Sequence, residues 1–365
     1  MSKKLEKKQI LDAADNGDWN TVRQWLVRDS DLIAAFAKHK MWLEQDPTLI
    51  AVLAKHKEYE YFDRRDLVKF ESQALLMATP TLLNTLLAGA TNPMDVLFRL
   101  AYARGFFVEW QGNDIVMSEN AWDAFKNLRR GQRPQYRSSD WLDLLAIMGD
   151  MVHSQGDRIV DCTPKFSVEK TYRRLFIEGF RPQRGMVPIW GGGYESRFEF
   201  FKKSGFPTKI CSLDLEPFVA MYVKALSSIT IPTATSCQGH DNKSSWFGRH
   251  TLGVELQGMC HVAFHAALWM TDDGLKQFAL PWKYGHRYIG SHPNIVIRYD
   301  LQTMASVFSE VIRAGQFIYD NILRFRAIRE WIGHEITESD ANLNQDELVQ
   351  KMIEIVNRFP AQVDG

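Results

Sequence analysis

A thiol and an imidazole stand close together in the segment Thr235-Ser-Cys-Gln-Gly-His240. Two residues separate Cys237 from His240, one of them Gly239, and the segment follows a β-branched run. Six of the ten histidines lie between Cys237 and His292. Thiols and imidazoles bind soft metal ions and act as nucleophiles or acid–base groups near neutral pH. The segment therefore predicts where chemistry happens, with Cys237 and His240 as the catalytic pair.

A zinc site is one interpretation of this segment. Zn²⁺ takes four ligands in structural sites, and Cys237 and His240 would supply two of them. The other two would come from His250 and His265, or from the neighbouring Cys260-His261. The alternative is a purely structural tight turn with a buried cysteine, which Gly239 permits because glycine adopts positive φ at little cost. Both interpretations stay open on the residues alone.

The order of elements around this motif resembles two groups of proteins. Helix, Ile-Pro-Thr-x-Thr-Ser-Cys-x-Gly-His, loop and strand follow one another over Leu213 to Leu256. This order resembles the Ser-Cys-x-Gly segment of the wybutosine-synthesising tRNA methyltransferases, and also a looser set of bacterial and phage α/β proteins with Ser-Cys-x-Gly-His. The likeness carries over Ser236, Cys237 and Gly239, whereas His240 stands where the methyltransferases have an arginine. The first resemblance implies S-adenosylmethionine as cofactor and RNA modification as activity.

Two further segments predict contacts with phosphate. In Gly191-Gly-Gly-Tyr-Glu-Ser-Arg197, Gly192 would let the backbone approach a phosphate and Arg197 would clamp it. Between Trp282 and His292, aromatic residues alternate with basic ones, so that Trp282 would stack and Arg287 would bind phosphate. A turn between elements and an amphipathic surface loop are the structural alternatives. Together with Gly239, these residues predict a phosphate-bearing substrate, either a nucleotide or RNA.

The composition is typical of a globular protein in a reducing compartment. The chain is 45% hydrophobic and 24% charged, with zero formal net charge, so bulk electrostatics indicate no partner. Residues 126–209 nevertheless carry 16 Lys and Arg against 9 Asp and Glu. This basic excess predicts either a surface that binds anions or a surface that is merely solvated. Four scattered cysteines form no disulfide framework, and no apolar run reaches the roughly 20 residues of a membrane span. We expect a cytoplasmic protein with no membrane contact.

The apolar periodicity predicts an α/β or α+β domain behind a helical one. Residues 1–128 are expected to form a helical domain with a hairpin at 105–117 that turns at Gly112-Asn113. The basic stretch 129–139 is the expected linker, and 140–334 the α/β domain that carries the site, with a parallel or mixed sheet under helical cover. An acidic helix is expected within 335–365.

Strands are expected at 158–160, 229–235, 251–256 and 294–298, and helices at 141–153, 168–179, 215–227, 260–270, 301–331 and 345–358. Near the N-terminus, Ala14 to Leu26 resembles one helical unit of an ankyrin repeat, without the repeat's period. This helical part would suit a protein partner. The function is therefore predicted as an enzyme or ligand-binding protein for nucleotides or RNA. The alternative is a non-catalytic interaction or inhibitor protein.

Overall fold

The computed structural model describes residues 79–118, 135–178, 211–231, 233–239, 250–256, 258–285, 293–300 and 302–360, with seven isolated positions before residue 23. The ankyrin-like unit and most of the predicted helical domain lie outside these ranges. Within them, no helix is both long enough and apolar enough to cross a bilayer.

The described residues before 179 form helices packed against a small antiparallel sheet. Asn92 begins one of these helices, where its side chain accepts a hydrogen bond from the Asp95 amide and Pro93 occupies the first turn. The helices are α7 (Thr79–Leu86), α8 (Pro93–Ala103), α10 (Gln135–Met148) and α11 (Val168–Arg173), the last continued by a π-helical turn at Arg174–Glu178. The strands are β1 (Val108–Gln111), β2 (Asp114–Met117), β3 (Val152–Gln155) and β4 (Arg158–Cys162).

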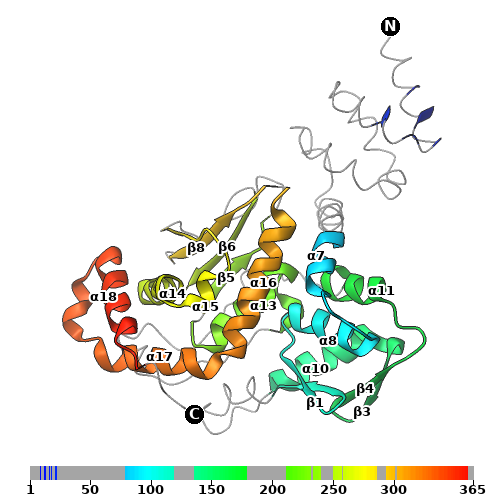
Figure 1. Cartoon of the computed structure of the whole chain (residues 1–365), viewed down its shortest axis with the longest axis horizontal. Helices are drawn as coiled ribbons and strands as arrows, with labels where there is room; N and C mark the ends of the chain where they lie inside the picture. The colour runs from blue at the N-terminus through cyan, green and yellow to red at the C-terminus, as the bar shows by residue number, and fades with distance from the viewer. Residues whose placement is uncertain are drawn as a thin grey trace.

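These four strands form sheet A, in the order β1-β2-β4-β3 (Figure 1). The hairpin of β1 and β2 turns at Gly112-Asn113, as the sequence predicts. β2 then pairs with β4, so strands on both sides of residues 129–139 share one sheet. The domain boundary at 129–139 stays a prediction, and a division there would separate β2 from its partner.

The residues after 210 form a second antiparallel sheet with helical cover. Sheet B has the order β5-β6-β8-β7, and every pairing in it is antiparallel. Its strands are β5 (Thr233–Cys237), β6 (Thr251–Leu256), β7 (Lys283–Gly285) and β8 (Asn294–Arg298). The helices are α13 (Pro217–Ser228), α14 (Met259–Thr271), α15 (Asp273–Lys276), α16 (Met304–Asp320), α17 (Ile322–Glu335) and α18 (Gln345–Asn357), with short 3₁₀ turns at Ser212–Asp214 and Glu338–Asn342.

The expected parallel or mixed sheet is wrong for the described strands, while the helical cover is confirmed. Three boundaries also differ. The first expected strand of sheet B starts late, because Ile229 caps the C-terminus of α13 and Ile231 lies in the connection that follows. The helix expected at 301–331 is two helices that meet at Asn321. The helix expected to reach His153 stops at Met148, and a 3₁₀ turn at Gly149–Met151 leads into β3.

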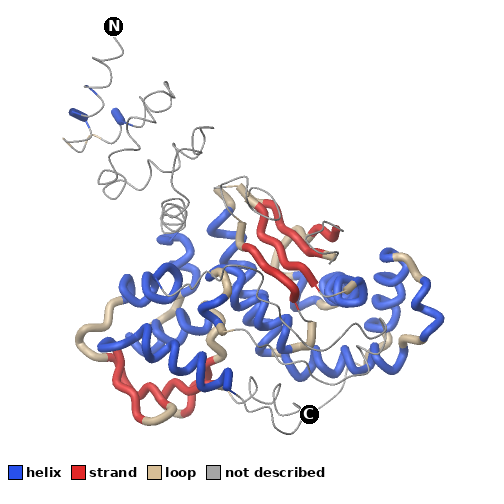
Figure 2. The backbone as a smooth tube through the Cα atoms, turned by 180° about the vertical axis from the view of Figure 1, so that it is seen from behind, coloured by secondary structure: helices blue, strands red, loops and turns tan. Residues whose placement is uncertain are grey.

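One hydrophobic core runs through both sheets, and it contains Ile115 and Ile159 of sheet A as well as Val254 and Ile297 of sheet B. α13 and α16 lie between the sheets, as Figures 1 and 2 show from opposite sides. Gly315 lets these two helices approach closely, since a Cβ there would lie 2.9 Å from the Tyr222 backbone. The close contact keeps α13, which carries Tyr222 and Lys224, in a defined position.

Candidate functional site

A buried polar group joins α10, α13 and the 3₁₀ turn at Ser212–Asp214. α10 contributes Asp140, the turn contributes Ser212 and α13 contributes Lys224, and none of the three is more than 6% exposed. Asp140 Oδ1 accepts a hydrogen bond from the Ser212 amide at 2.8 Å, while Asp140 Oδ2 forms an ion pair with Lys224 Nζ. Lys224 Nζ also donates to Ser212 Oγ at 2.8 Å. A buried lysine is tolerated here because its charge is paired and hydrogen-bonded.

A second buried cation lies beside this group. Arg104, which is fully buried at the end of α8, donates to three backbone carbonyls, those of Leu175, Ser212 and Leu215, at 2.5–2.9 Å. Burial lowers the pKa of the Arg104 guanidinium to about 9, against the opposing effect of Asp140 and Asp214. The guanidinium therefore stays protonated at neutral pH and connects α8 to the chain before and after residues 179–210.

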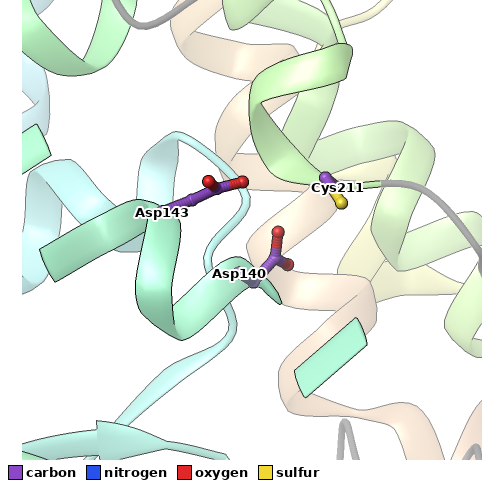
Figure 3. Close-up of side chains that lie close together, drawn as sticks. All are labelled: Asp140, Asp143 and Cys211. Atoms are coloured by element: carbon purple, nitrogen blue, oxygen red, sulfur yellow. The ribbon is translucent and has the colours of Figure 1, made fainter. Parts of the chain in front are cut away.

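Three possible metal ligands meet at the edge of this group. Their ligand atoms, carboxylate oxygens of Asp140 and Asp143 and the Cys211 sulfur, all lie within 4.8 Å of one another. Asp140 and Asp143 are three residues apart on α10 and so share a face of that helix, and Cys211 comes from the segment just before the 3₁₀ turn (Figure 3). Asp140 is buried, and the other two side chains are half-buried. Carboxylate and thiolate ligands together suit Zn²⁺.

The sequence analysis missed this group because its members are far apart in the chain. Asp140 and Ser212 are 72 residues apart, and Asp140 and Lys224 are 84. The only local signal is the pair of aspartates at helix spacing, Asp140 and Asp143, which is common on solvated helix faces. Cys211 is one of four scattered cysteines, and its sequence neighbours do not indicate a role as a metal ligand.

Of the predicted site residues, Cys237, Gly239 and His250 lie together at one end of sheet B. Cys237 ends β5 and pairs with Gly253, while His250 immediately precedes β6. The Gly239 amide donates to the Cys237 sulfur at 3.3 Å. Tyr299 closes this end of the sheet, donating its hydroxyl to the Gln238 carbonyl at 2.8 Å and packing edge-on against the His250 ring. The left-handed conformation of His250, with φ of 50°, shows that the backbone is tightly constrained here.

The same turn also caps α13. The Phe218 amide in the first turn of α13 donates to Gln238 Oε1 at 3.2 Å, and the Gln238 amide donates to the Glu216 carboxylate. A helix N-terminus attracts anions through its free amides. In this protein Gln238 and Glu216 already occupy that position, so these contacts support the structural interpretation of the Ser236–Gly239 turn.

Replacing Gly239 with alanine is expected to lower the free energy of unfolding by about 2–4 kcal/mol. A Cβ at residue 239 would lie 2.5 Å from the Tyr299 hydroxyl and 3.0 Å from the Thr251 backbone, at a φ of 93°. Gly112→Ala is the matched control, because Gly112 also has positive φ but nothing within 4 Å of its Cβ position. Urea denaturation of both variants measures the difference. Equal costs would mean that packing against Tyr299 contributes nothing.

His265 and Trp282 lie together in an aromatic cluster away from Cys237. Their rings are 5.2 Å apart edge-on, and Trp282 stacks on Tyr222 at 5.1 Å. Cys237 pairs with Gly253, Gly253 with Val296, and Val296 with Lys283, so two strands separate Cys237 from the start of β7. At about 4.8 Å per strand spacing, this separation is roughly 14 Å. Because Tyr222 stacks on Trp282, one face of the indole is covered and is closed to a stacking base.

The predicted zinc ligands Cys237, His250 and His265 do not form a group of this kind. Within the part of the chain that the structure describes, three or more possible metal ligands come together at Asp140, Asp143 and Cys211. His240, Gly192, Arg197 and Arg287 lie outside the described residues, so their predicted roles stay predictions.

In comparisons with known proteins, no family model, no curated protein and no solved structure matches this chain. The resemblance to the wybutosine-synthesising methyltransferases stays a prediction.

Proposed function

We propose that this protein binds a divalent metal ion of the zinc class through Asp140, Asp143 and Cys211. The observation that carries the proposal is the convergence of two carboxylates and one thiol within 4.8 Å, from two segments far apart in the sequence. This group is a different set from the zinc ligands predicted at Cys237, His240, His250 and His265, which stay a prediction. It would hold the ion with three protein ligands.

The charges around the group favour a divalent cation. Arg104 and Lys224 contribute two positive charges, while Asp140, Asp143 and Asp214 contribute three negative ones. Ionised carboxylates of Asp140 and Asp143, together with a Cys211 thiolate, would each interact favourably with a metal ion of two positive charges.

The contacts of Asp140 are of the kind that support a metal-ligating carboxylate. Such carboxylates are usually oriented by hydrogen bonds from a second layer of residues. The Ser212 amide and Lys224 hold the Asp140 carboxylate in one orientation, and Oδ1 accepts a single hydrogen bond among the described residues. No second donor to Oδ1 comes from the described residues, and the other lone pair of Oδ1 would serve an ion, although the Lys224 charge would weaken its binding.

Three protein ligands leave a coordination position open, as in catalytic rather than structural zinc sites. An ion with an open position polarises a phosphoryl oxygen and lowers the pKa of a bound water. The predicted phosphate segment, Gly191 to Arg197, ends 14 residues before Cys211. We therefore propose a phosphate-bearing substrate, a nucleotide or RNA, for the same site.

Zinc binding to the purified chain tests the proposal. Wild-type protein is expected to bind one Zn²⁺ per chain in equilibrium dialysis, and Co²⁺ in its place should give the absorption band of a cobalt–thiolate bond. Cys211→Ser should abolish that band, and Cys211→Ser and Asp143→Asn should each weaken binding by roughly a hundredfold. Cys162→Ser is the matched control, because Cys162 is also a half-buried cysteine outside any disulfide but lies outside the group.

Absence of bound metal, or metal binding that survives in both variants, would refute the site. Thermal-shift measurements with nucleotides, with and without Zn²⁺, then test the substrate class. A shift that requires both zinc and nucleotide supports nucleotide binding at the ion. No shift with any nucleotide favours the alternative of a partner-binding protein.

A further inference from the structure

A chain of hydrogen bonds links α13, α14 and the edge strand β7. Trp269 Nε1 of α14 donates to the Tyr222 hydroxyl of α13 at 3.2 Å. Tyr222 Oη lies 2.5 Å from His265 Nε2, and His265 Nδ1 lies 3.3 Å from the hydroxyl of Tyr284 in β7. Tyr222 and His265 are fully buried, whereas Trp269 and Tyr284 are half-buried.

The direction of each hydrogen bond follows from the chemistry of the groups. An indole N–H can only donate, so the Tyr222 oxygen accepts from Trp269, and its own proton is available to His265 Nε2. A neutral imidazole that accepts at Nε2 carries its proton on Nδ1. In this tautomer the Nδ1 proton would be donated to the Tyr284 oxygen, 3.3 Å away. The chain is therefore complete only while His265 is neutral.

Protonation of His265 would break the chain. Both ring nitrogens would then donate, and the Tyr222 proton would lose its acceptor in a buried position. The groups that face the ring are the neutral Tyr222 of α13, Tyr284 and Trp282 at β7, and Trp269 of α14 itself. None of these four side chains can compensate a positive charge by ionising near neutral pH.

Charged side chains on the neighbouring elements do not offset this cost. Burial alone lowers the pKa of His265 to about 3. The charges of Glu255 in β6, Asp273 in α15 and Lys351 in α18 do not contribute to this lowering. Arg329, a buried cation, acts on His261 one helical turn away rather than on His265. The neutral state of His265 thus depends on its remaining enclosed.

The element that encloses His265 most weakly is β7. This strand is three residues long, and among the described strands it pairs with β8 alone. Two aromatic side chains at its start, Trp282 and Tyr284, lie against the His265 ring at 5.2 and 5.8 Å. They are two positions apart, so they share one face of the strand, while the exposed Lys283 lies on the other.

We propose that this hydrogen-bond chain is a pH-sensitive lock, which holds edge strand β7 on α14 at neutral pH and releases it in mild acid. Release exposes His265, whose pKa returns to about 6.5 in water. The open state then binds a proton that the closed state excludes, so acid favours opening. Between pH 7.5 and pH 5.0 the open fraction should rise roughly thirtyfold.

Hydrogen exchange of the full-length protein tests the lock. Protection factors of β7 and β8 amides, corrected for the intrinsic effect of pH, should fall roughly thirtyfold from pH 7.5 to pH 5.0. His265→Gln should remove this dependence, because glutamine can both donate and accept but does not titrate. His334→Gln is the matched control, since His334 is exposed and should leave the dependence unchanged.

Protection that stays constant with pH in the wild type, or that still falls in His265→Gln, would overturn the lock. If His265→Gln does not fold, an NMR titration of the wild-type histidine ring decides the question. A ring that stays neutral down to pH 4 while the β7 amides lose protection agrees with the lock, because the open fraction is then small. A ring that stays neutral while β7 stays protected overturns it. A ring that titrates near pH 6.5 while β7 stays protected excludes it.

Discussion

Replacing Lys224 with methionine is expected to lower the free energy of unfolding by about 3–5 kcal/mol. The substitution removes the partner of Asp140 and leaves a carboxylate that is 6% exposed without its counter-ion. Ser212 Oγ also loses the ammonium that donates to it at 2.8 Å. Chemical denaturation monitored by circular dichroism measures the change. The effect should be large because a buried charge without a partner costs far more than the pair contributes.

Two comparisons make the Lys224 result interpretable. Lys276→Met breaks an exposed ion pair with Asp273, so its cost should be within about 0.5 kcal/mol of zero. The double variant Lys224→Met with Asp140→Leu removes both buried charges and should recover much of the lost stability. If Lys224→Met costs no more than Lys276→Met, the buried ion pair does not support the fold as described.

Lowering the pH from 7 to 5 is expected to reduce the free energy of unfolding by about 4 kcal/mol. His261 and His265 are both buried on α14, and burial lowers the pKa of each to about 3, with the charge of Arg329 adding to the effect on His261. Both histidines regain a pKa of about 6.5 on unfolding. Stability is therefore complete above pH 6.5 and is lost as the pH falls toward 3, because the unfolded chain binds two protons that the folded chain excludes.

Denaturation curves at several pH values check this slope. In the double variant His261→Gln with His265→Gln the loss between pH 7 and pH 5 should shrink to near zero, since carboxylates remain ionised over that range. A wild-type protein equally stable at pH 5 and pH 7 would contradict the neutral, buried state of both histidines.

The sequence predicted most accurately those elements whose residue pattern fits only one type of secondary structure. β6 and β8 have the expected bounds, Thr251–Leu256 and Asn294–Arg298, because short runs of β-branched and aliphatic residues suit buried strands. The start of β5 was wrong because Ile229 and Ile231 are buried in either structure, and an apolar run alone does not distinguish a helix end from a strand. β7 was missed because three residues carry no measurable period.

The candidate site could be predicted only in part, since its geometry depends on tertiary contacts. Gly239 was recognised as a turn glycine, but the reason it must be glycine is Tyr299, which is 60 residues further along. His265 was expected to bind metal, yet two tyrosines from other elements lie at hydrogen-bonding distance from its nitrogens. The ion pair of Lys224 and Asp140 cannot be predicted from the sequence, because only the fold brings these two residues, 84 positions apart, into contact.

The partners of Arg104 also determine the order in which the chain can complete its core during synthesis. The guanidinium binds the carbonyls of Leu175, Ser212 and Leu215, which are 71 to 111 residues further along the chain. At ribosomal rates of about 5–20 residues per second, Leu215 emerges roughly 5–20 s after Arg104. Until then the nascent α8 carries a charged side chain on what will be its buried face. That charge would keep the early fragment hydrated, and the core can close only once α13 has been made.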